Sequence, residues 1–149
     1  MTAIHPSGMV ASALARGGAV VALETSVIAQ GLPPPRNREC VERMTAAIRE
    51  AGAVPAWVGV AGGEVRIGLS RDELEAFAEP GAALKVARRD LPFALASGGL
   101  GATTVSTTIW AAARVGIGVA WNSGLISPRS SCCSIHTPPR IITTHRNMR

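Results

Sequence analysis

AVVALE, residues Ala19–Glu24, is the stretch that decides the fold. It is a short, nearly continuous apolar run, which is typical of a strand buried on both faces of a sheet. Two more strands are expected at Val54–Val60 and Glu64–Gly68, joined as a hairpin by the glycine-containing turn Ala61–Gly63. A fourth short strand, also expected to be buried, is predicted at Ala83–Ala87.

Helical segments alternate with these strands. Helices are predicted at Gly8–Arg16 and Asn37–Ala51, and a capping box at Ser70–Glu73 opens a short one. Gly98–Gly101 is expected to be a flexible loop, with a further helix at Ala102–Val115. Strands that alternate with helices, together with one hairpin, indicate an α/β fold with a mixed central sheet flanked by helices.

The regular pattern ends near the C-terminus. Ile117–Ala120 is expected to begin another strand, but after Trp121 the sequence follows neither a helical nor a strand period. The formal charge of +5 is concentrated there, because residues 121–149 hold four arginines and no acid, leaving 11 basic and 10 acidic residues in residues 1–120. We therefore expect one α/β portion at residues 1–120 and a divergent, disordered basic tail at residues 121–149.

Composition argues against several classes of protein. The positive charge is confined to the tail and aromatic residues make up only 3%, so a nucleic-acid-binding face is not expected. Ala94–Ala113 carries no charge, but its glycines and hydroxyl residues indicate a loop and a helix rather than a membrane span. No signal peptide is recognisable at the N-terminus, so a cytoplasmic protein that does not contact a membrane is expected.

The cysteines do not define a site. Three occur, Cys40, Cys132 and Cys133, and the last two lie near His136 and His145. Their spacing fits no standard zinc pattern, and chance occurrence in a biased tail is the favoured interpretation.

Two side chains are candidates for acid–base or amine chemistry. Glu24 closes the apolar run, and a carboxyl group in that place is partly desolvated, which suits a general acid; a capping or ion-pair role is the alternative. Lys85 is the only lysine of the chain. It could be a phosphate ligand, a Schiff-base nucleophile or the partner of Asp90.

A phosphate site is predicted at the start of the last helix. Gly98–Thr104 (GGLGATT) offers a close backbone approach, helix N-terminal N–H groups and the hydroxyls of Thr103 and Thr104. An ordinary glycine-rich turn is the alternative. Arg88 and Arg89 could hold a phosphate in a bidentate manner, or could form a solvated basic turn.

Several sequence blocks resemble one known family. These are Ala22–Pro33 (ALETSVIAQGLP), Gly52–Ala56 (GAVPA), Val65–Ser70 (VRIGLS), Lys85–Pro92 (KVARRDLP) and Gly101–Val105 (GATTV). In this order they resemble the pseudouridine-5'-phosphate glycosidases, also called the indigoidine synthase A-like family. The resemblance covers most of the chain up to the tail.

The resemblance implies a specific reaction. Such enzymes reversibly cleave the C–C glycosidic bond of pseudouridine 5'-phosphate to uracil and ribose 5-phosphate, with Mn²⁺, a proton-donating glutamate and a Schiff-base lysine. Glu24 falls on the catalytic glutamate, and Lys85, Thr104 and Val105 fall on substrate-binding positions. A homotrimer is also implied by the resemblance.

The chain departs from the family pattern from Trp121 onward. Members of the family are about twice as long, and continue to a metal-binding aspartate and the Schiff-base lysine. No acid follows Asp90 here, and Lys85 aligns to a different position. The hypothesis is that residues 1–120 form the N-terminal portion of a larger domain and that residues 121–149 are an out-of-frame or alternatively ended tail. We expect this chain to be inactive as a glycosidase; the alternative is a non-catalytic phosphosugar-binding or interaction fragment.

Overall fold

The structure is a computed structural model and describes residues 4–118, which form a mixed sheet between two groups of helices. Within these residues the sheet has the order β1-β4-β3-β6-β5, and β2 also pairs with β3. Its strands are β1 (Ile4–Pro6), β2 (Val20–Glu24), β3 (Val54–Ala61), β4 (Glu64–Ile67), β5 (Ala83–Val86) and β6 (Leu100–Thr103).

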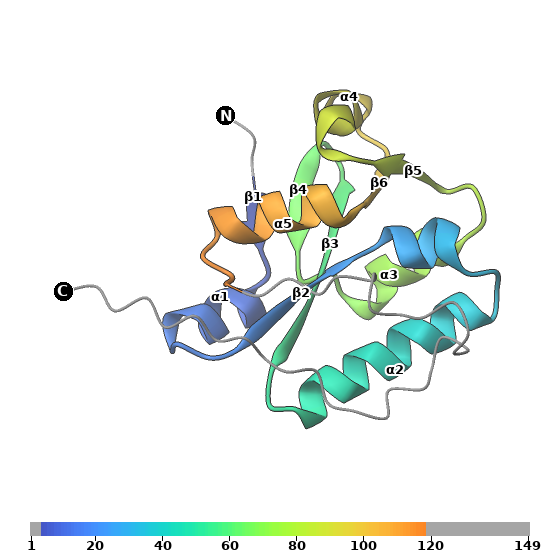
Figure 1. Cartoon of the computed structure of the whole chain (residues 1–149). Helices are drawn as coiled ribbons and strands as arrows, with labels where there is room; N and C mark the ends of the chain where they lie inside the picture. Colours follow the sequence, from blue (N-terminus) through green and yellow to red (C-terminus); the bar gives the residue numbers. More distant parts are fainter. Residues whose placement is uncertain (1–3, 119–149) are drawn as a thin grey trace.

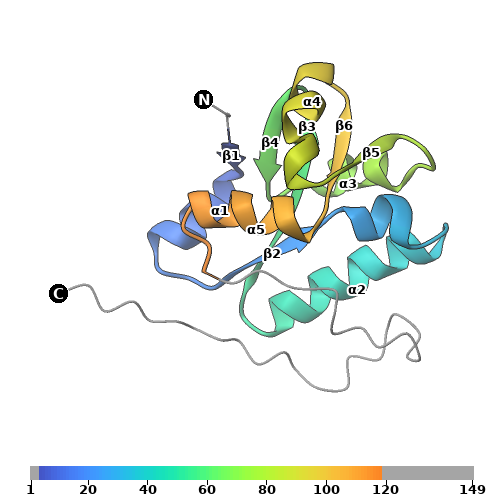
Figure 2. The same ribbon diagram turned by 45° about the horizontal axis from the view of Figure 1, so that its top comes forward.

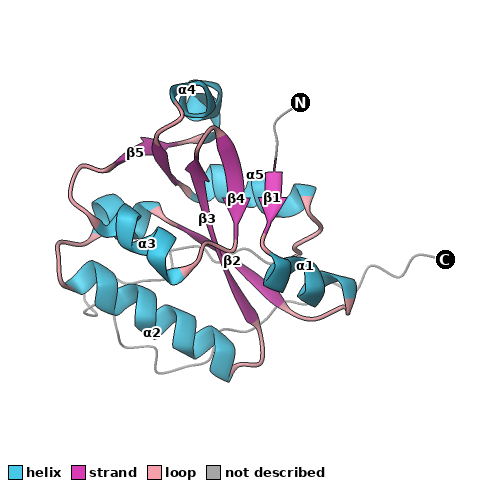
Figure 3. Ribbon diagram, turned by 180° about the vertical axis from the view of Figure 1, so that it is seen from behind, coloured by secondary structure: helices cyan, strands magenta, loops and turns pink. Residues whose placement is uncertain are grey.

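Five α-helices and two short helical turns surround the described sheet. They are α1 (Gly8–Ala15), the π-helical turn η1 (Val27–Gly31), α2 (Arg36–Glu50), α3 (Arg71–Ala78), the 3-10 turn η2 (Arg88–Asp90), α4 (Leu91–Ser97) and α5 (Val105–Arg114). One hydrophobic cluster joins the sheet to α1, α4 and α5, and a second joins it to η1, α2 and α3. Figures 1 and 3, seen from opposite sides, show these two layers on either side of the strands.

The pairing of the strands confirms the mixed α/β sheet. β2 runs parallel to β3, β1 to β4 and β5 to β6, whereas β3 is antiparallel to both β4 and β6. The predicted hairpin is β3–β4, and its turn residues Gly62 and Gly63 have φ of +61° and +79°. Glycine adopts positive φ angles without strain, so this turn follows directly from the sequence.

The glycine-rich segment before α5 corrects one prediction. Residues 100–103 form strand β6 rather than a loop, and α5 begins at Val105 rather than Ala102. The reason is packing, because a Cβ added to Gly101 would lie 2.8 Å from Val86 Cγ2 and 3.0 Å from Val60 Cβ. Gly101 therefore lets neighbouring strands approach closely and does not mark flexibility.

The strand that carries Lys85 corrects a second prediction. β5 lies at the edge of the sheet, and its two central residues, Leu84 and Lys85, are exposed, so it is not a buried strand. The predicted helix before β2 is confirmed as α1, with Ser7 as its N-cap, whereas β1 was not predicted. The expected strand from Ile117 and the expected tail fall mostly or wholly outside the described residues. None of the helices in residues 4–118 has the length and apolar character needed to cross a bilayer.

Candidate active site

Three strands end at the same level of the sheet. Glu24, the last residue of β2, is opposite Val58 of β3, and Ala102 of β6 is opposite the next residue, Gly59. Because β4 pairs with the other side of β3, β2 and β6 share one edge and meet head to head there. β5 ends beside β6, with Val86 opposite its last residue. Figure 2 shows the end of β2 next to the start of α5.

Buried threonine hydroxyls fill the gap between β2 and β6. Thr25 Oγ1 donates to the Val58 carbonyl oxygen over 2.8 Å and accepts a hydrogen bond from the Thr103 N–H over 3.0 Å. Thr103 Oγ1 donates to the same carbonyl over 2.6 Å and lies 3.0 Å from Thr108 Oγ1. Thr107 Oγ1 donates to the Val86 carbonyl over 2.9 Å. These bonds hold the ends of β2 and β6, the middle of β3 and the first turns of α5 together.

Glu24 is enclosed at this junction. It is only 8% exposed, and no side chain of residues 4–118 forms a hydrogen bond or an ion pair with its carboxyl group. The alternative of a capping or ion-pair role is therefore not realised within the described residues. A buried polar group without a partner costs stability, and such groups are common where a ligand completes the site.

The N-terminus of α5 lies at the same junction. Thr104 is its N-cap residue in extended conformation, and its N–H donates to the Val86 carbonyl oxygen over 3.0 Å. The Thr104 side chain caps no helix N–H but lies 3.2 Å from Ser106 Oγ. The first turn of α5 contains no acid. Helix N–H groups and the helix dipole therefore favour an anion here, next to the half-buried Thr104 and Val105.

The phosphate site predicted at Gly98–Thr104 differs from this arrangement at one residue. Thr103 was expected to offer its hydroxyl to a phosphate, but its side chain is fully buried and its hydrogen is used on Val58. Of the two predicted hydroxyls, only Thr104 is half-exposed at the surface of the junction.

Lys85 lies one residue before the end of β5 and is exposed. It is opposite Ala102, which belongs to the hydrophobic cluster of α2 and α3, whereas Glu24 is opposite Val58 of the other cluster. The two side chains therefore leave the sheet on different faces. Asp90 does not pair with Lys85 in the described residues; one of its carboxylate oxygens accepts the Ala87 N–H over 3.0 Å and the other lies 3.6 Å from Arg89 Nε.

A shallow hollow of about 320 Å³ follows the outer side of β5. Its lining includes Lys85 and Arg89 together with Leu84 and Phe93, which are 51% and 69% exposed. This hollow has the volume of a small ligand and is bordered by the predicted site residue Lys85.

The two arginines of the η2 turn have separate surroundings. The Arg88 guanidinium carbon lies 4.1 Å from the ring centre of Trp110 on α5, and Arg114 stacks on the same ring at 4.3 Å. Arg89 is 89% exposed, and its Nε lies 3.6 Å from an Asp90 carboxylate oxygen. They do not form a joint bidentate site, which favours the alternative of a solvated turn for Arg89.

The residues that sequence reasoning missed are the buried threonines. Thr25, Thr107 and Thr108 were not predicted as site residues, although each follows or lies near a strand end. A hydroxyl residue directly after a buried strand is the signal that could have indicated them, because buried hydroxyls must find partners.

Residues 4–118 bring together no group of three His, Cys, Asp or Glu side chains that could hold a metal ion. The donor set of the described residues thus does not fit the manganese that the family resemblance implies, and we derive no chemical step through a metal.

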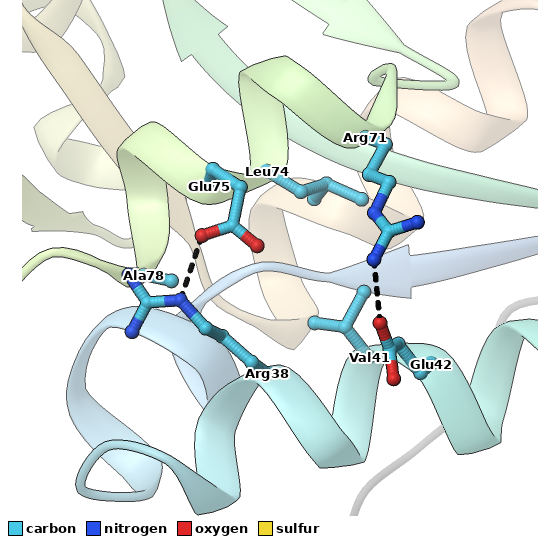
Figure 4. A pocket seen from close by; sticks show the side chains of 7 residues that line it. All are labelled: Arg38, Val41, Glu42, Arg71, Leu74, Glu75 and Ala78. Carbon is cyan, nitrogen blue, oxygen red and sulfur yellow. Dashed lines mark hydrogen bonds and ion pairs between the residues drawn. The ribbon is translucent and has the colours of Figure 1, made fainter.

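A second hollow, of about 30 Å³, lies between α2 and α3 (Figure 4). Ion pairs cross it: Arg38 Nε lies 2.6 Å from Glu75 Oε2, and Arg71 pairs with Glu42 over 2.8 Å. The side-chain hydrogen bond to Glu75 is the main cause that raises the pKa of Arg38. The hollow is too small for a ligand beyond water, and neither Glu24 nor Lys85 lines it, so we interpret it as a helix–helix contact.

Fold and junction define an α/β protein with a buried acid beside a helix N-terminus. Residues 9–126 match the sequence profile of the family described as "Indigoidine synthase A like protein". The chain belongs to this family. It is 48% identical over 122 residues to the pseudouridine-5'-phosphate glycosidase of Rhodospirillum centenum, covering 82% of the chain, and 51% identical over 119 residues to that of Streptomyces griseus, covering 80%. The chain spans 37% of the length of each of these two relatives.

Solved structures agree with this assignment. The fold matches the crystal structure of the prealnumycin C-glycosynthase AlnA in complex with ribulose 5-phosphate, with a TM-score of 0.70 and 43% identity. It matches the indigoidine synthase A-like protein of Thermotoga maritima with a TM-score of 0.70 and 36% identity. Each match covers 80% of this chain and 38% of the other. The expected membership of the family and the expected α/β fold are confirmed.

Proposed function

We propose that this chain carries the acid and the phosphosugar-binding part of a pseudouridine-5'-phosphate glycosidase site. The observation that supports it most is the buried Glu24 carboxyl, which has no partner in residues 4–118 and lies at the junction where α5 begins. The relatives are named for the same activity, and one solved relative holds ribulose 5-phosphate.

Glu24 has the role of proton donor in this proposal. Cleavage of the bond between the sugar C1′ and the uracil ring carbon leaves the electron pair on the uracil, and that carbon must gain a proton. A carboxyl group enclosed at the end of β2 can deliver it. Over the whole reaction one water is consumed: its hydroxyl is gained by the sugar carbon and its hydrogen by the base.

The substrate phosphate is placed against the first turn of α5. The N–H groups of this turn and the Thr104 hydroxyl offer neutral donors, and Lys85 offers a positive charge from β5. Since Lys85 and Glu24 leave the sheet on different faces, a ligand that contacts both must lie over the strand ends. Val105 supplies an apolar contact at that point.

The manganese and the Schiff-base lysine of the family remain part of the proposal for a complete enzyme. The 149 residues contain a single lysine and no acid after Asp90, so we expect these residues alone to bind phosphosugar without turnover. The manganese would supply Lewis-acid chemistry where it is bound.

Incubation with pseudouridine 5'-phosphate and Mn²⁺, with and without borohydride, tests this expectation. Uracil release is followed by absorbance and adducts by mass spectrometry. We expect neither uracil nor a reduced adduct. Turnover, or an adduct on Lys85, would show that the binding role assigned to this lysine is wrong.

A phosphosugar-binding protein without catalysis is the second candidate. It is favoured because the α5 N-terminus, Thr104 and Lys85 are all present in a folded arrangement. Calorimetric titration with ribose 5-phosphate should give saturable binding, and Lys85→Met should raise Kd about tenfold, because a charge-assisted contact is lost. Arg71→Met is the matched control, since its side chain is 81% exposed on α3. Absence of saturable binding would contradict both candidates for these residues.

A further inference from the structure

We propose that Thr25 is a positioning residue, whose hydroxyl fixes the Glu24 carboxyl relative to the first turn of α5. The inference rests on the proposed function of Glu24 as proton donor. It concerns a residue that does not itself contact the substrate and acts only through its neighbours.

Thr25 connects the end of β2 to both β3 and β6. Its hydroxyl donates to the Val58 carbonyl of β3 over 2.8 Å and accepts from the Thr103 N–H of β6 over 3.0 Å. Within residues 4–118 it is the one side chain that links the end of β2 to both neighbours at this level. Because Thr25 directly follows Glu24, each of these bonds also restricts the backbone of the acid.

No backbone ladder joins β2 to β6. β2 and β6 lie end to end along β3, so their backbones do not pair with one another. Thr103 already uses its single hydroxyl hydrogen on the Val58 carbonyl, and Thr108 must therefore donate to Thr103. The direct bond between the two strand ends is the one from the Thr103 N–H to Thr25 Oγ1.

The bond between Thr25 and Thr103 also links Glu24 to the N-terminus of α5. Thr103 is followed by Thr104, the N-cap of α5, and Thr25 is preceded by the acid. A shift between Thr25 and Thr103 therefore changes the distance from the Glu24 carboxyl to the helix N–H groups. Thr25, Thr103 and Thr108 are at most 1% exposed, so water cannot readily replace a lost hydroxyl.

The experiment compares Thr25→Val, which keeps the shape and removes the hydroxyl, with Thr25→Ser, which keeps the hydroxyl. Thr45→Val is the matched control, because Thr45 Oγ1 also accepts one hydrogen bond, from Trp57 Nε1 over 3.0 Å, on the other side of the sheet. Glutamate side chains are labelled with ¹³C at the carboxyl carbon, and the Glu24 signal is identified by its loss in Glu24→Gln.

We expect Thr25→Val to shift or broaden the Glu24 carboxyl signal and to raise the Kd for ribose 5-phosphate about tenfold. Thr25→Ser should restore both, and Thr45→Val should change neither by more than about twofold in Kd. A Glu24 signal that is the same in Thr25→Val and the unchanged chain overturns the inference. An equal shift in Thr45→Val also overturns it, because a general loss of stability would then explain the effect.

The two proposals fail in different ways. If the unchanged chain does not bind ribose 5-phosphate, the proposed function fails, while the Glu24 signal, recorded without ligand, still decides the role of Thr25. If Thr25→Val does not fold, hydrogen exchange of the Thr103 amide in the unchanged chain decides instead. Protection as strong as that of the β2–β3 ladder supports the positioning role of Thr25, and exchange as fast as in an exposed loop overturns it.

Discussion

β2 and β5 are both short apolar strands that end at the same junction, but they create opposite environments. All five residues of β2 are buried, whereas in β5 only the first and last are. Within the described residues each of the two strands pairs with one neighbour only, but β2 contributes to the hydrophobic clusters on both faces of the sheet, whereas the middle of β5 contributes to neither. The packing of helices against a strand, rather than its place in the sheet, therefore decides whether its polar residue is enclosed, as Glu24 is, or exposed, as Lys85 is.

The largest effect is expected when one leucine from each strand is replaced. Leu23 is fully buried in β2, and Leu23→Ala should lower the free energy of unfolding by about 3 kcal/mol, because it leaves a cavity. Leu84 is 51% exposed in β5, and Leu84→Ala should lower it by less than about 0.5 kcal/mol. Urea denaturation followed by circular dichroism measures both. Equal losses would show that β5 is covered as fully as β2.

The close packing of β6 gives the next largest effect. Gly101→Ala should cost about 2 kcal/mol, since the new methyl group would clash with Val86 and Val60 on the two neighbouring strands. Gly99→Ala is the control, because the nearest atom to its added Cβ is Ser97 Oγ at 3.9 Å. Thermal unfolding of the two variants measures the difference. A neutral Gly101→Ala would mean that β6 is not held between β3 and β5 as described.

Replacing Glu24 should change the free energy of unfolding more than replacing Lys85. Glu24→Met replaces a buried carboxyl that has no partner in the described residues, and should raise the free energy of unfolding by about 1 kcal/mol. Lys85→Met alters an exposed side chain and should change it by less than about 0.5 kcal/mol. Urea titration at neutral pH measures both. A loss of stability in Glu24→Met would argue that the carboxyl has a partner in the folded chain.

The smallest effect concerns Glu73 on α3. Its carboxylate is partly exposed, so its contribution to stability should be small, as for the exposed residues of β5. The Ser70 backbone N–H, followed by Arg66, lowers the pKa of Glu73. A lowered folded-state pKa contributes stability above the unfolded value, about 4.3, and this stability is lost as pH falls through the folded value.

Glu73→Gln should therefore be less stable than the unchanged chain at pH 6, by less than about 1 kcal/mol, and this difference should shrink as the pH falls below about 4. Urea titrations at several pH values measure the convergence. A difference that stays constant with pH would mean that the charge of Glu73 does not contribute.

Most of the fold could be predicted from the sequence because its signals are local. The apolar run of β2, the capping box Ser70–Glu73 and the Gly62–Gly63 turn each need only neighbouring residues. β6 was missed because Gly101 carries a long-range packing requirement that looks like a loop signal. The exposure of β5 was missed because a four-residue apolar pattern does not show whether helices will cover the strand.

The candidate site was predictable only in part. Glu24 and Thr104 could be indicated by their places at a strand end and a helix start. Their meeting could not, since it depends on β2 and β6 sharing one edge of β3. The role of Thr103 was mistaken because a hydroxyl looks the same in the sequence whether it faces a ligand or a buried carbonyl.

The bond between Thr103 and Thr25 spans 78 residues of sequence. During synthesis, β2, β3 and β4 leave the ribosome long before β6, so the edge of β3 beyond Val58 stays unpaired for that interval. Contacts of such long range form late and slowly. Glu24 is thus synthesised early, but the junction around it is complete only after β6 and the start of α5 have been synthesised. Ligand binding at the junction is therefore delayed until nearly all described residues have folded.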